Sequence, residues 1–257
     1  MLEIILAIVA AGSPQQPSSA DTGAVVSRYP EGSTHGFLAL HSLDGVELAR
    51  GDLVQRANGT AIESTLSFRF GDGSRFEETV DFTQTRAIEL EKYHLNERGP
   101  AFDRDLDATL WRSGRYQVRA TSHRDGKTGT YAGSLHLPAD VANGLPLVIA
   151  KNLRPGERRT VHLVAFLPKP RVIELEFIPA APGRVRSGLV DESTIQFTLK
   201  PEIGGVVGLL AKLLGKIPPD SHIWIATTGA PAFLRFEGPM YTGPVWRIDL
   251  ALPAWPR

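Results

Sequence analysis

The chain has 257 residues, and its 28 lysines and arginines balance 28 aspartates and glutamates, so its formal net charge is zero. A protein that binds nucleic acid through an extended surface needs clustered positive charge, and this balance argues against such a surface. The absence of cysteine excludes disulfide bonds, thiolate zinc sites and cysteine nucleophiles. The length suits one large β-rich or mixed domain, or two small ones.

The first residues predict export. Ile4–Ala11 is an apolar run that would span about 12 Å as a helix, too short to cross a bilayer. The run is typical of the hydrophobic region of a secretory signal peptide. We therefore expect a signal-peptide-like segment at 1–11, a flexible tether at 12–23, a single β-rich domain at 24–257, and a periplasmic or otherwise exported protein. The alternative is a buried N-terminal strand in a cytoplasmic protein.

Alternating side chains predict antiparallel strands through the first half of the chain. Ile62–Phe70 and Phe76–Phe82 each place apolar residues on one parity and polar residues on the other, which is the period of a half-buried strand. Gly71–Ser74 supplies the tight turn between them, and Asn58-Gly59 and Asp125-Gly126 provide two more. Three such turns predict an antiparallel meander.

The second half predicts short helical turns followed by more strands. Leu137–Pro146 and Pro146–Asn152 have room only for such turns before glycine or proline ends them. Further strands are expected at Arg159–Leu167, Val172–Ile178, Thr194–Leu199, His222–Ala226, Ala232–Phe236 and Val245–Leu252. The expected total is about eleven strands. Because Arg159–Leu167 is apolar on both parities, we expect burial on both of its faces.

The segment Ile203–Ile217 interrupts the β pattern. It is apolar nearly all round, and Val206, Leu209 and Leu213 fall on one face at helical spacing. Its glycines disfavour an isolated helix, so we expect a helix that forms when packed. Three interpretations stay open: a helix that fills the open end of the sheet, a mobile apolar lid, or a segment that inserts at a membrane surface.

Together these elements predict a mainly β protein. The expected architecture is one large curved antiparallel sheet, a half-barrel or open barrel, with one or two short helices packed at its concave face. We expect no transmembrane span in the mature chain, because no apolar run is long enough.

No sequence motif predicts catalysis or metal binding. The seven histidines show no metal-binding spacing, and no nucleophile elbow, phosphate loop or dinucleotide fingerprint is present. Asp103, Asp105 and Asp107 lack the glycine and glutamate of a calcium loop, so we interpret them as acids on an edge strand. We expect no catalytic residues, no metal and no cofactor. The alternative is a hydrolase whose site is assembled from distant residues, with His94, His136 or His222 beside a carboxylate.

Aromatic residues predict an apolar ligand site. Trp224, Phe236 and Trp246 lie close together near the C-terminus, and they are either core residues or the lining of a partly open β-shell. The residues that we expect to contact a ligand are Phe68, Phe82, Leu209, Leu213, Trp224, Phe236 and Trp246. In the last strand, alternation predicts that Trp246 faces the interior while Arg247 and Asp249 face outward.

Several motifs resemble one protein family. They are the apolar N-terminus, the meander with Asp-Gly turns, the break at Leu137–Leu145, Pro168-Lys169-Pro170-Arg171, and the closing block of Trp224, Pro231–Phe236 and Pro244-Val245-Trp246. In these features residues 27–252 resemble the uncharacterised exported bacterial proteins of the DUF3108 type, which are similar in architecture to lipoprotein-carrier half-barrels. The resemblance implies a curved antiparallel sheet wrapped around a helix or ligand, and it implies no reaction.

The sequence therefore predicts a periplasmic or cell-envelope β-shell that binds a lipid or other apolar molecule without catalysis. The alternative is a structural or assembly component of the cell envelope, in which the helix fills the shell. The partner that we expect is an apolar small molecule, and we expect no nucleic acid.

Overall fold

A computed structural model describes residues 23–187, 190–202, 219–241 and 243–251. Within them the chain forms fifteen strands and one helix, α1 (Pro146–Asn152). The strands are β1 (Thr34–His41), β2 (Glu47–Asn58), β3 (Ala61–Phe70), β4 (Arg75–Thr83), β5 (Glu89–Arg98), β6 (Arg104–Trp111), β7 (Arg115–Ser122), β8 (Thr128–Ser134), β9 (Arg159–Ala165), β10 (Arg171–Pro179), β11 (Gly183–Ser187), β12 (Val190–Glu202), β13 (Ser221–Ala226), β14 (Ala232–Gly238) and β15 (Trp246–Leu250).

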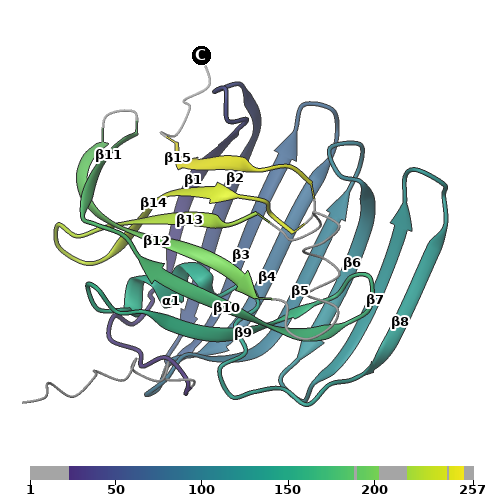
Figure 1. The fold of residues 1–257 in the computed structure, drawn as a ribbon, viewed down its shortest axis with the longest axis horizontal. Coiled ribbons are helices and arrows are strands. Elements are labelled where there is room, and N and C mark those ends of the chain that lie inside the picture. Colours follow the sequence, from purple (N-terminus) through teal and green to yellow (C-terminus); the bar gives the residue numbers. More distant parts are fainter. Residues whose placement is uncertain (1–22, 188–189, 203–218, 242, 252–257) are drawn as a thin grey trace, which may run out of the picture.

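All fifteen strands belong to one antiparallel sheet that is not closed (Figure 1). The order is β8-β7-β6-β5-β4-β3-β2-β1-β15-β14-β13-β12-β10-β9, and β11 pairs with β12 beside this path. The predicted fold class is confirmed, but the predicted count of about eleven strands is too low. The strands outside the predicted eleven are β1, β5, β6 and β11.

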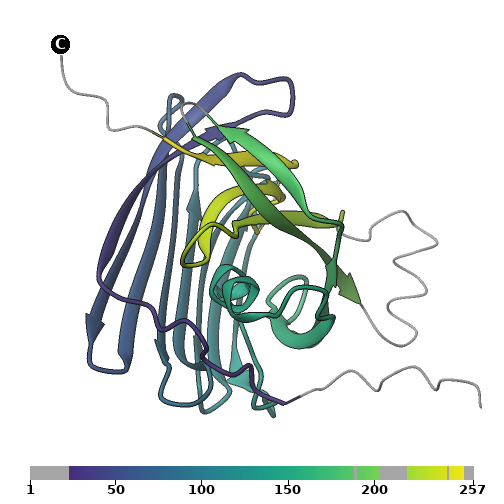
Figure 2. The ribbon, with the colours of Figure 1, turned by 90° about the vertical axis from the view of Figure 1, so that its left-hand side faces the viewer.

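The sheet curves so that its two halves face each other across a common core. In Figure 2 the strands β9–β15 lie over one face of the β1–β8 meander, and α1 lies in the space between them. The core includes side chains from both halves and from α1. Its largest fully buried aromatic side chains are Phe68, Phe82, Phe166, Phe177 and Phe197. The predicted short helix at the concave face is thus confirmed in α1.

Alternation places the core side chains, and one glycine lets the sheet pack closely. Phe68 on β3 lies opposite Phe76 on β4, with ring centroids 6.4 Å apart. On the other side Phe68 lies opposite Gly51 on β2. A Cβ atom at Gly51 would lie 2.5 Å from the Phe68 ring and 2.1 Å from the carbonyl oxygen of Ser67. Only glycine therefore allows the ring to cover β2 at this point.

The chain before β1 is held by α1. The Asn152 Oδ1 atom accepts hydrogen bonds from the backbone N–H groups of Arg28 (2.6 Å) and Tyr29 (2.8 Å). Lys151 forms an ion pair with Glu31, with 2.5 Å between Nζ and Oε1. These contacts close one end of the shell.

Two predicted segments fall wholly or mostly outside the described residues. The first is the signal-peptide-like segment and tether, of which only Gly23 is described; its carbonyl oxygen accepts a hydrogen bond from Arg159. The second is Ile203–Ile217, together with the predicted ligand contacts Leu209 and Leu213.

One edge of the sheet, β9, is capped by the chain that precedes it. The backbone N–H of Ala142 donates to the carbonyl of His162 (2.8 Å), and that of His162 donates to the carbonyl of Asp140 (3.4 Å). The Asn143 side chain bonds both the N–H (2.8 Å) and the C=O (3.0 Å) of Val164. Residues on both faces of β9 are buried, as predicted.

The predicted edge position of the acidic residues is wrong. Asp105 and Asp107 lie on β6, which pairs with β5 on one side and β7 on the other. Their carboxylates face away from the core and contact polar neighbours: Asp105 contacts His123, and Asp107 contacts Asn96. The alternation of acids thus marks the polar face of an inner strand.

Candidate functional site

Four of the predicted ligand contacts lie in or against the packed core. Phe68 and Phe82 are each 1% exposed, and Trp246 is 4% exposed. The Trp246 ring makes an edge contact with Phe102, with 5.9 Å between centroids. Phe236 is partly buried against the same core. These four side chains share one interior, in which they pack against other side chains of the protein.

Trp224 lies on the opposite face of the sheet. Its neighbours Ile223 and Ile225 on β13 point into the core, so Trp224 points away from it. There it packs against a smaller apolar cluster that contains Val185, Ala226 and Leu234. The strand itself is central, between β12 and β14. The structure therefore does not bring Trp224 to the other predicted ligand contacts.

The outward side chains of β15 form an ionic cluster. Asp249 accepts hydrogen bonds from Arg235 Nε (2.7 Å) and Arg247 Nε (2.8 Å), and His41 Nδ1 lies 3.6 Å from the same carboxylate. The predicted alternation is confirmed, since Trp246 is buried and Arg247 is partly exposed on the other face. Asp249 is nevertheless buried, because the two guanidinium groups and the imidazole cover it.

The interior also holds polar groups. The Tyr93 hydroxyl donates to Glu78 Oε1 over 2.6 Å. Burial raises the pKa of Glu78, against the effect of this hydrogen bond, and burial together with the nearby Glu78 charge raises the pKa of Tyr93. The Tyr241 hydroxyl accepts a hydrogen bond from the backbone N–H of Phe166, whose ring stacks on Tyr93. These bonds hold the polar groups in place within the shell.

Besides His41, four further histidines lie beside aspartates. The pairs and their N–O distances are His35 with Asp52 (2.7 Å), His94 with Asp107 (3.4 Å), His123 with Asp105 (2.8 Å) and His162 with Asp140 (2.7 Å). Of the histidines considered for catalysis, His94 lies on the polar face of β5. The Nδ1 atom of His222 contacts Gln196 and Thr198 rather than a carboxylate.

The His123 ring should titrate above its usual pKa. Its Nδ1 faces the carbonyl oxygen of Phe102 (2.8 Å) and its Nε2 faces Asp105 Oδ1 (2.8 Å), so only the protonated ring donates to both acceptors. The hydrogen bond with Asp105 is the main cause that raises the pKa of His123 above 6.5. The pair therefore stabilises the fold fully below pH 6.5 and loses this effect as pH rises through the raised pKa.

An NMR titration of the imidazole resonances tests this. In the Asp105→Asn variant the His123 pKa should fall back toward its usual value. A wild-type His123 that titrates at or below its usual value would contradict the assignment of a protonated ring.

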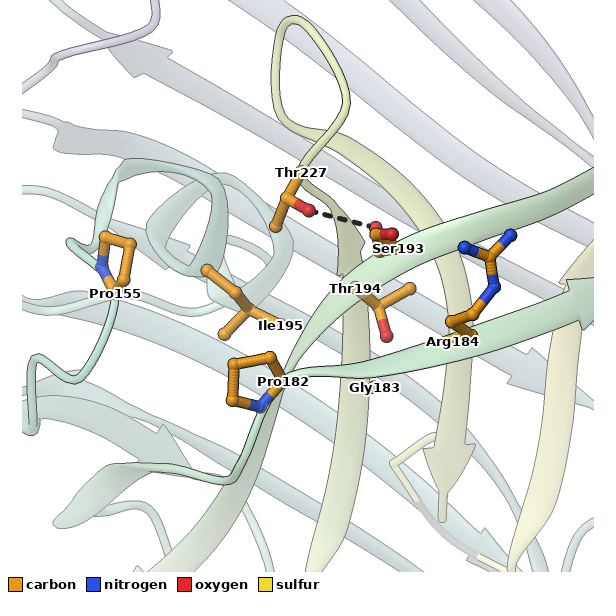
Figure 3. Close-up of a pocket in the computed structure, with 8 residues that line it drawn as sticks. All are labelled: Pro155, Pro182, Gly183, Arg184, Ser193, Thr194, Ile195 and Thr227. Carbon is orange, nitrogen blue, oxygen red and sulfur yellow. Dashed lines mark hydrogen bonds between the residues drawn. The ribbon is translucent and has the colours of Figure 1, made fainter.

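One pocket lies at the base of the β11–β12 hairpin (Figure 3). It has a volume of about 460 Å³ and is open to solvent. Its lining residues are Pro155, Pro182, Gly183, Arg184, Ser193, Thr194, Ile195 and Thr227. They come from the loop after α1, from β11, from β12 and from the end of β13. None of the predicted ligand contacts that the structure describes lines this pocket.

The pocket combines apolar walls with a buried hydroxyl group. Pro155, Pro182 and Ile195 supply the apolar walls. Thr194 is 1% exposed, and its Oγ1 atom has no hydrogen-bond partner among the described residues. In Figure 3 this hydroxyl points toward Gly183, where an added Cβ would lie 3.8 Å away. A buried hydroxyl without a partner costs free energy, so a donor or acceptor that entered here would bind favourably.

Positive charge lies at the rim of the pocket. Arg184 donates from Nε (3.2 Å) and Nη2 (3.0 Å) to Asp191 Oδ1, and Arg186 donates to Asp191 Oδ2 (3.3 Å). The hydrogen bonds from Arg184 and Arg186 lower the pKa of Asp191, which stays ionised. Two guanidinium groups thus share one carboxylate, and of these groups the one that lines the pocket is Arg184.

Sequence reasoning missed this pocket because its walls come from four separate segments. The available signals were the Pro155-Gly156 and Pro182-Gly183 pairs, where the chain turns and a glycine leaves space. Neither pair carries information about Thr194. The pairing of β11 and β13 with the two sides of β12 brings these walls together.

No three histidine, aspartate or glutamate side chains in the described ranges are grouped so that they could hold a metal ion. Within the same ranges no helix has the length and apolar character needed to span a membrane. No family model, curated protein or solved structure matches this chain.

Proposed function

We propose that the protein is a non-catalytic binding protein that holds a small amphiphile in the pocket around Thr194. The ligand has an apolar body and one anionic group, as a fatty acid does. The observation that carries the proposal is the buried Thr194 hydroxyl without a partner in an otherwise largely apolar pocket. Small-molecule sites commonly combine apolar walls with a few polar groups in a volume of this size.

Each part of the pocket supports a part of the ligand. The proline and isoleucine walls favour burial of an apolar chain. The Thr194 hydroxyl can donate to or accept from a polar group of the ligand. Arg184, which lines the pocket and shares Asp191 with Arg186, favours an anionic group at the rim, and this attraction should weaken as salt is added.

The filled interior favours a second function. Aromatic side chains, α1 and the residues before it occupy the concave side of the sheet. Such a solid shell suits a structural or assembly component that acts through its surface. In both functions we propose an exported, cell-envelope location, and the similarity to DUF3108-type proteins supports it through the apolar N-terminus and the curved sheet.

The Thr194→Val variant tests the binding function. Valine keeps the shape of threonine and removes the hydroxyl, so the variant should bind palmitate about tenfold more weakly, which corresponds to about 1.4 kcal/mol. Its free energy of unfolding without ligand should be unchanged or higher by up to about 1 kcal/mol, since no protein hydrogen bond is lost. Displacement of anilinonaphthalene sulfonate measures the binding, and urea unfolding measures the stability.

Thr198→Val is the matched control. Thr198 lies on the same strand, and its hydroxyl contacts His222 Nδ1 (3.2 Å) outside the pocket. This variant should bind palmitate as the wild type does. Wild-type protein that binds neither probe, or equal palmitate affinity in wild type and Thr194→Val, would refute the binding function.

A further inference from the structure

Among the described residues, nothing pairs with the second edge of the sheet, β8. β8 pairs only with β7, and no described element lies beyond it in Figure 1. The N–H of Leu135 donates to Gly114, and the C=O of Lys127 accepts from Ser122, so odd-numbered residues of this segment bond to β7. In an antiparallel ladder the bonding direction alternates. The backbone groups that point away from the sheet are therefore those of Thr128, Thr130, Ala132 and Ser134.

The composition of β8 leaves this edge unprotected. Natural edge strands are commonly protected by charged side chains, by proline or by a covering segment. The other edge, β9, is covered by the segment around Asp140–Asn143. The sequence of β8 is TGTYAGS, which contains neither a charge nor a proline. This contrast between the two edges points to β8 as a surface for strand addition.

We propose that β8 pairs antiparallel with β8 of a second copy of this chain, around a two-fold axis at Tyr131. The sequence of β8 is nearly palindromic about this residue. In that register Thr128 lies opposite Ser134, Gly129 opposite Gly133, and Thr130 opposite Ala132. A two-fold interface requires such self-complementarity, because the same patch serves both copies.

The hydrogen-bond phase fits this register. With Tyr131 on the axis, the residues that face each other in bonding pairs are Thr130 with Ala132 and Thr128 with Ser134. These are the residues whose N–H and C=O groups point outward. If the register shifted by a single residue, each residue whose backbone N–H and C=O groups point outward would face a residue whose groups already bond to β7. The backbone therefore excludes shifts by one residue, and among the registers that it allows, the axis at Tyr131 is the one in which the side chains match.

The side chains leave room for the second copy. The Tyr131 ring leans along its own strand over Gly129, where an added Cβ would lie 3.1 Å from its hydroxyl. The hydroxyl of Tyr116 covers Gly133 in the same way. The two Tyr131 rings of a dimer therefore lean in opposite directions over glycine pairs. Lys127 faces Leu135 across the axis, so no like charges are opposed.

Sedimentation velocity over a range of concentrations tests the pairing. A seven-residue strand pair buries less area than a standard protein interface, so we expect a dimer whose fraction rises with concentration. Ala132→Pro removes an outward N–H and no bond to β7, and it should raise the dissociation constant at least about tenfold. Ala132→Ser keeps this N–H and should dimerise as the wild type does.

A cysteine cross-link tests the register. Because the chain has no cysteine, a Tyr131→Cys variant can form only an intermolecular disulfide, across a pair whose Cα atoms lie about 4.5 Å apart. A Thr128→Cys variant places its two thiols about 20 Å apart and should not cross-link. Three results would overturn the proposal: a wild type that stays monomeric, equal dimerisation of Ala132→Pro, or equal cross-linking of the two cysteine variants.

Discussion

Replacing Asp249 with asparagine should lower the free energy of unfolding by about 3 kcal/mol, because the change leaves neighbouring positive charges without a buried partner. The Asp249 side chain is 8% exposed and holds both Arg235 and Arg247 through Nε. Asparagine has almost the same shape but no charge. The two guanidinium groups, which are 21% and 26% exposed, regain only part of their hydration. Urea unfolding at neutral pH measures the effect.

Glu63→Gln is the control for this prediction. Glu63 pairs with Arg56 over 2.9 Å on the surface, where both side chains are more than half exposed. Exposed pairs contribute about 0–1 kcal/mol, so this variant should stay close to the wild type. If Asp249→Asn is no less stable than Glu63→Gln, the buried cluster does not stabilise the fold.

Replacing Phe68 with alanine should lower the free energy of unfolding by about 3–5 kcal/mol, the usual range for a fully buried aromatic residue. The Phe68 ring is 1% exposed and fills the space over Gly51. Because Gly51 has no side chain, the neighbouring strand cannot fill the cavity that the substitution leaves. Calorimetry and urea unfolding should give the same loss.

The loss of stability in Phe68→Ala also distinguishes a ring packed in the core from a ring that lines a ligand pocket. A ring that lined an empty ligand pocket would be partly exposed without ligand, and its removal would cost little. Phe37→Ala is the control, since Phe37 is 39% exposed on β1 and should cost less than about 1 kcal/mol. Equal losses in the two variants would show that Phe68 is not part of a packed core.

The sequence predicted the strands whose alternation is regular and missed those in which it is broken. β3 and β4 follow a clean period of two, and glycine-rich turns mark their ends. In β5 the fully buried Glu97 lies on the same face as Leu95. The polarity of the side chains therefore does not indicate which face of this strand is buried. A prediction based on alternation therefore misses β5, although its backbone pairs regularly with β4 and β6 in the meander.

Burial on the outer face could not be predicted for a related reason. Alternation correctly places Asp249 on the outer face of the sheet, but it does not predict that the carboxylate is buried there. The carboxylate is buried because Arg235 on β14 and His41 on β1 contact it. β1 is far from Asp249 in the sequence and becomes its neighbour only in the folded sheet. Pairings of this kind follow from the order of strands in the sheet, which no local pattern encodes.

The pairing of the first strand with the last has a consequence for synthesis on the ribosome. β1 to β8 pair with their neighbours in sequence and can form as they emerge, but β1 gains its second partner only when β15 is made. At about 5–20 residues per second, the chain between His41 and Trp246 takes on the order of 10–40 seconds to appear. During that time the N–H and C=O groups of Leu38–His41 that later bond to β15 lack their final partner. The nascent chain therefore exposes an apolar strand edge throughout this interval.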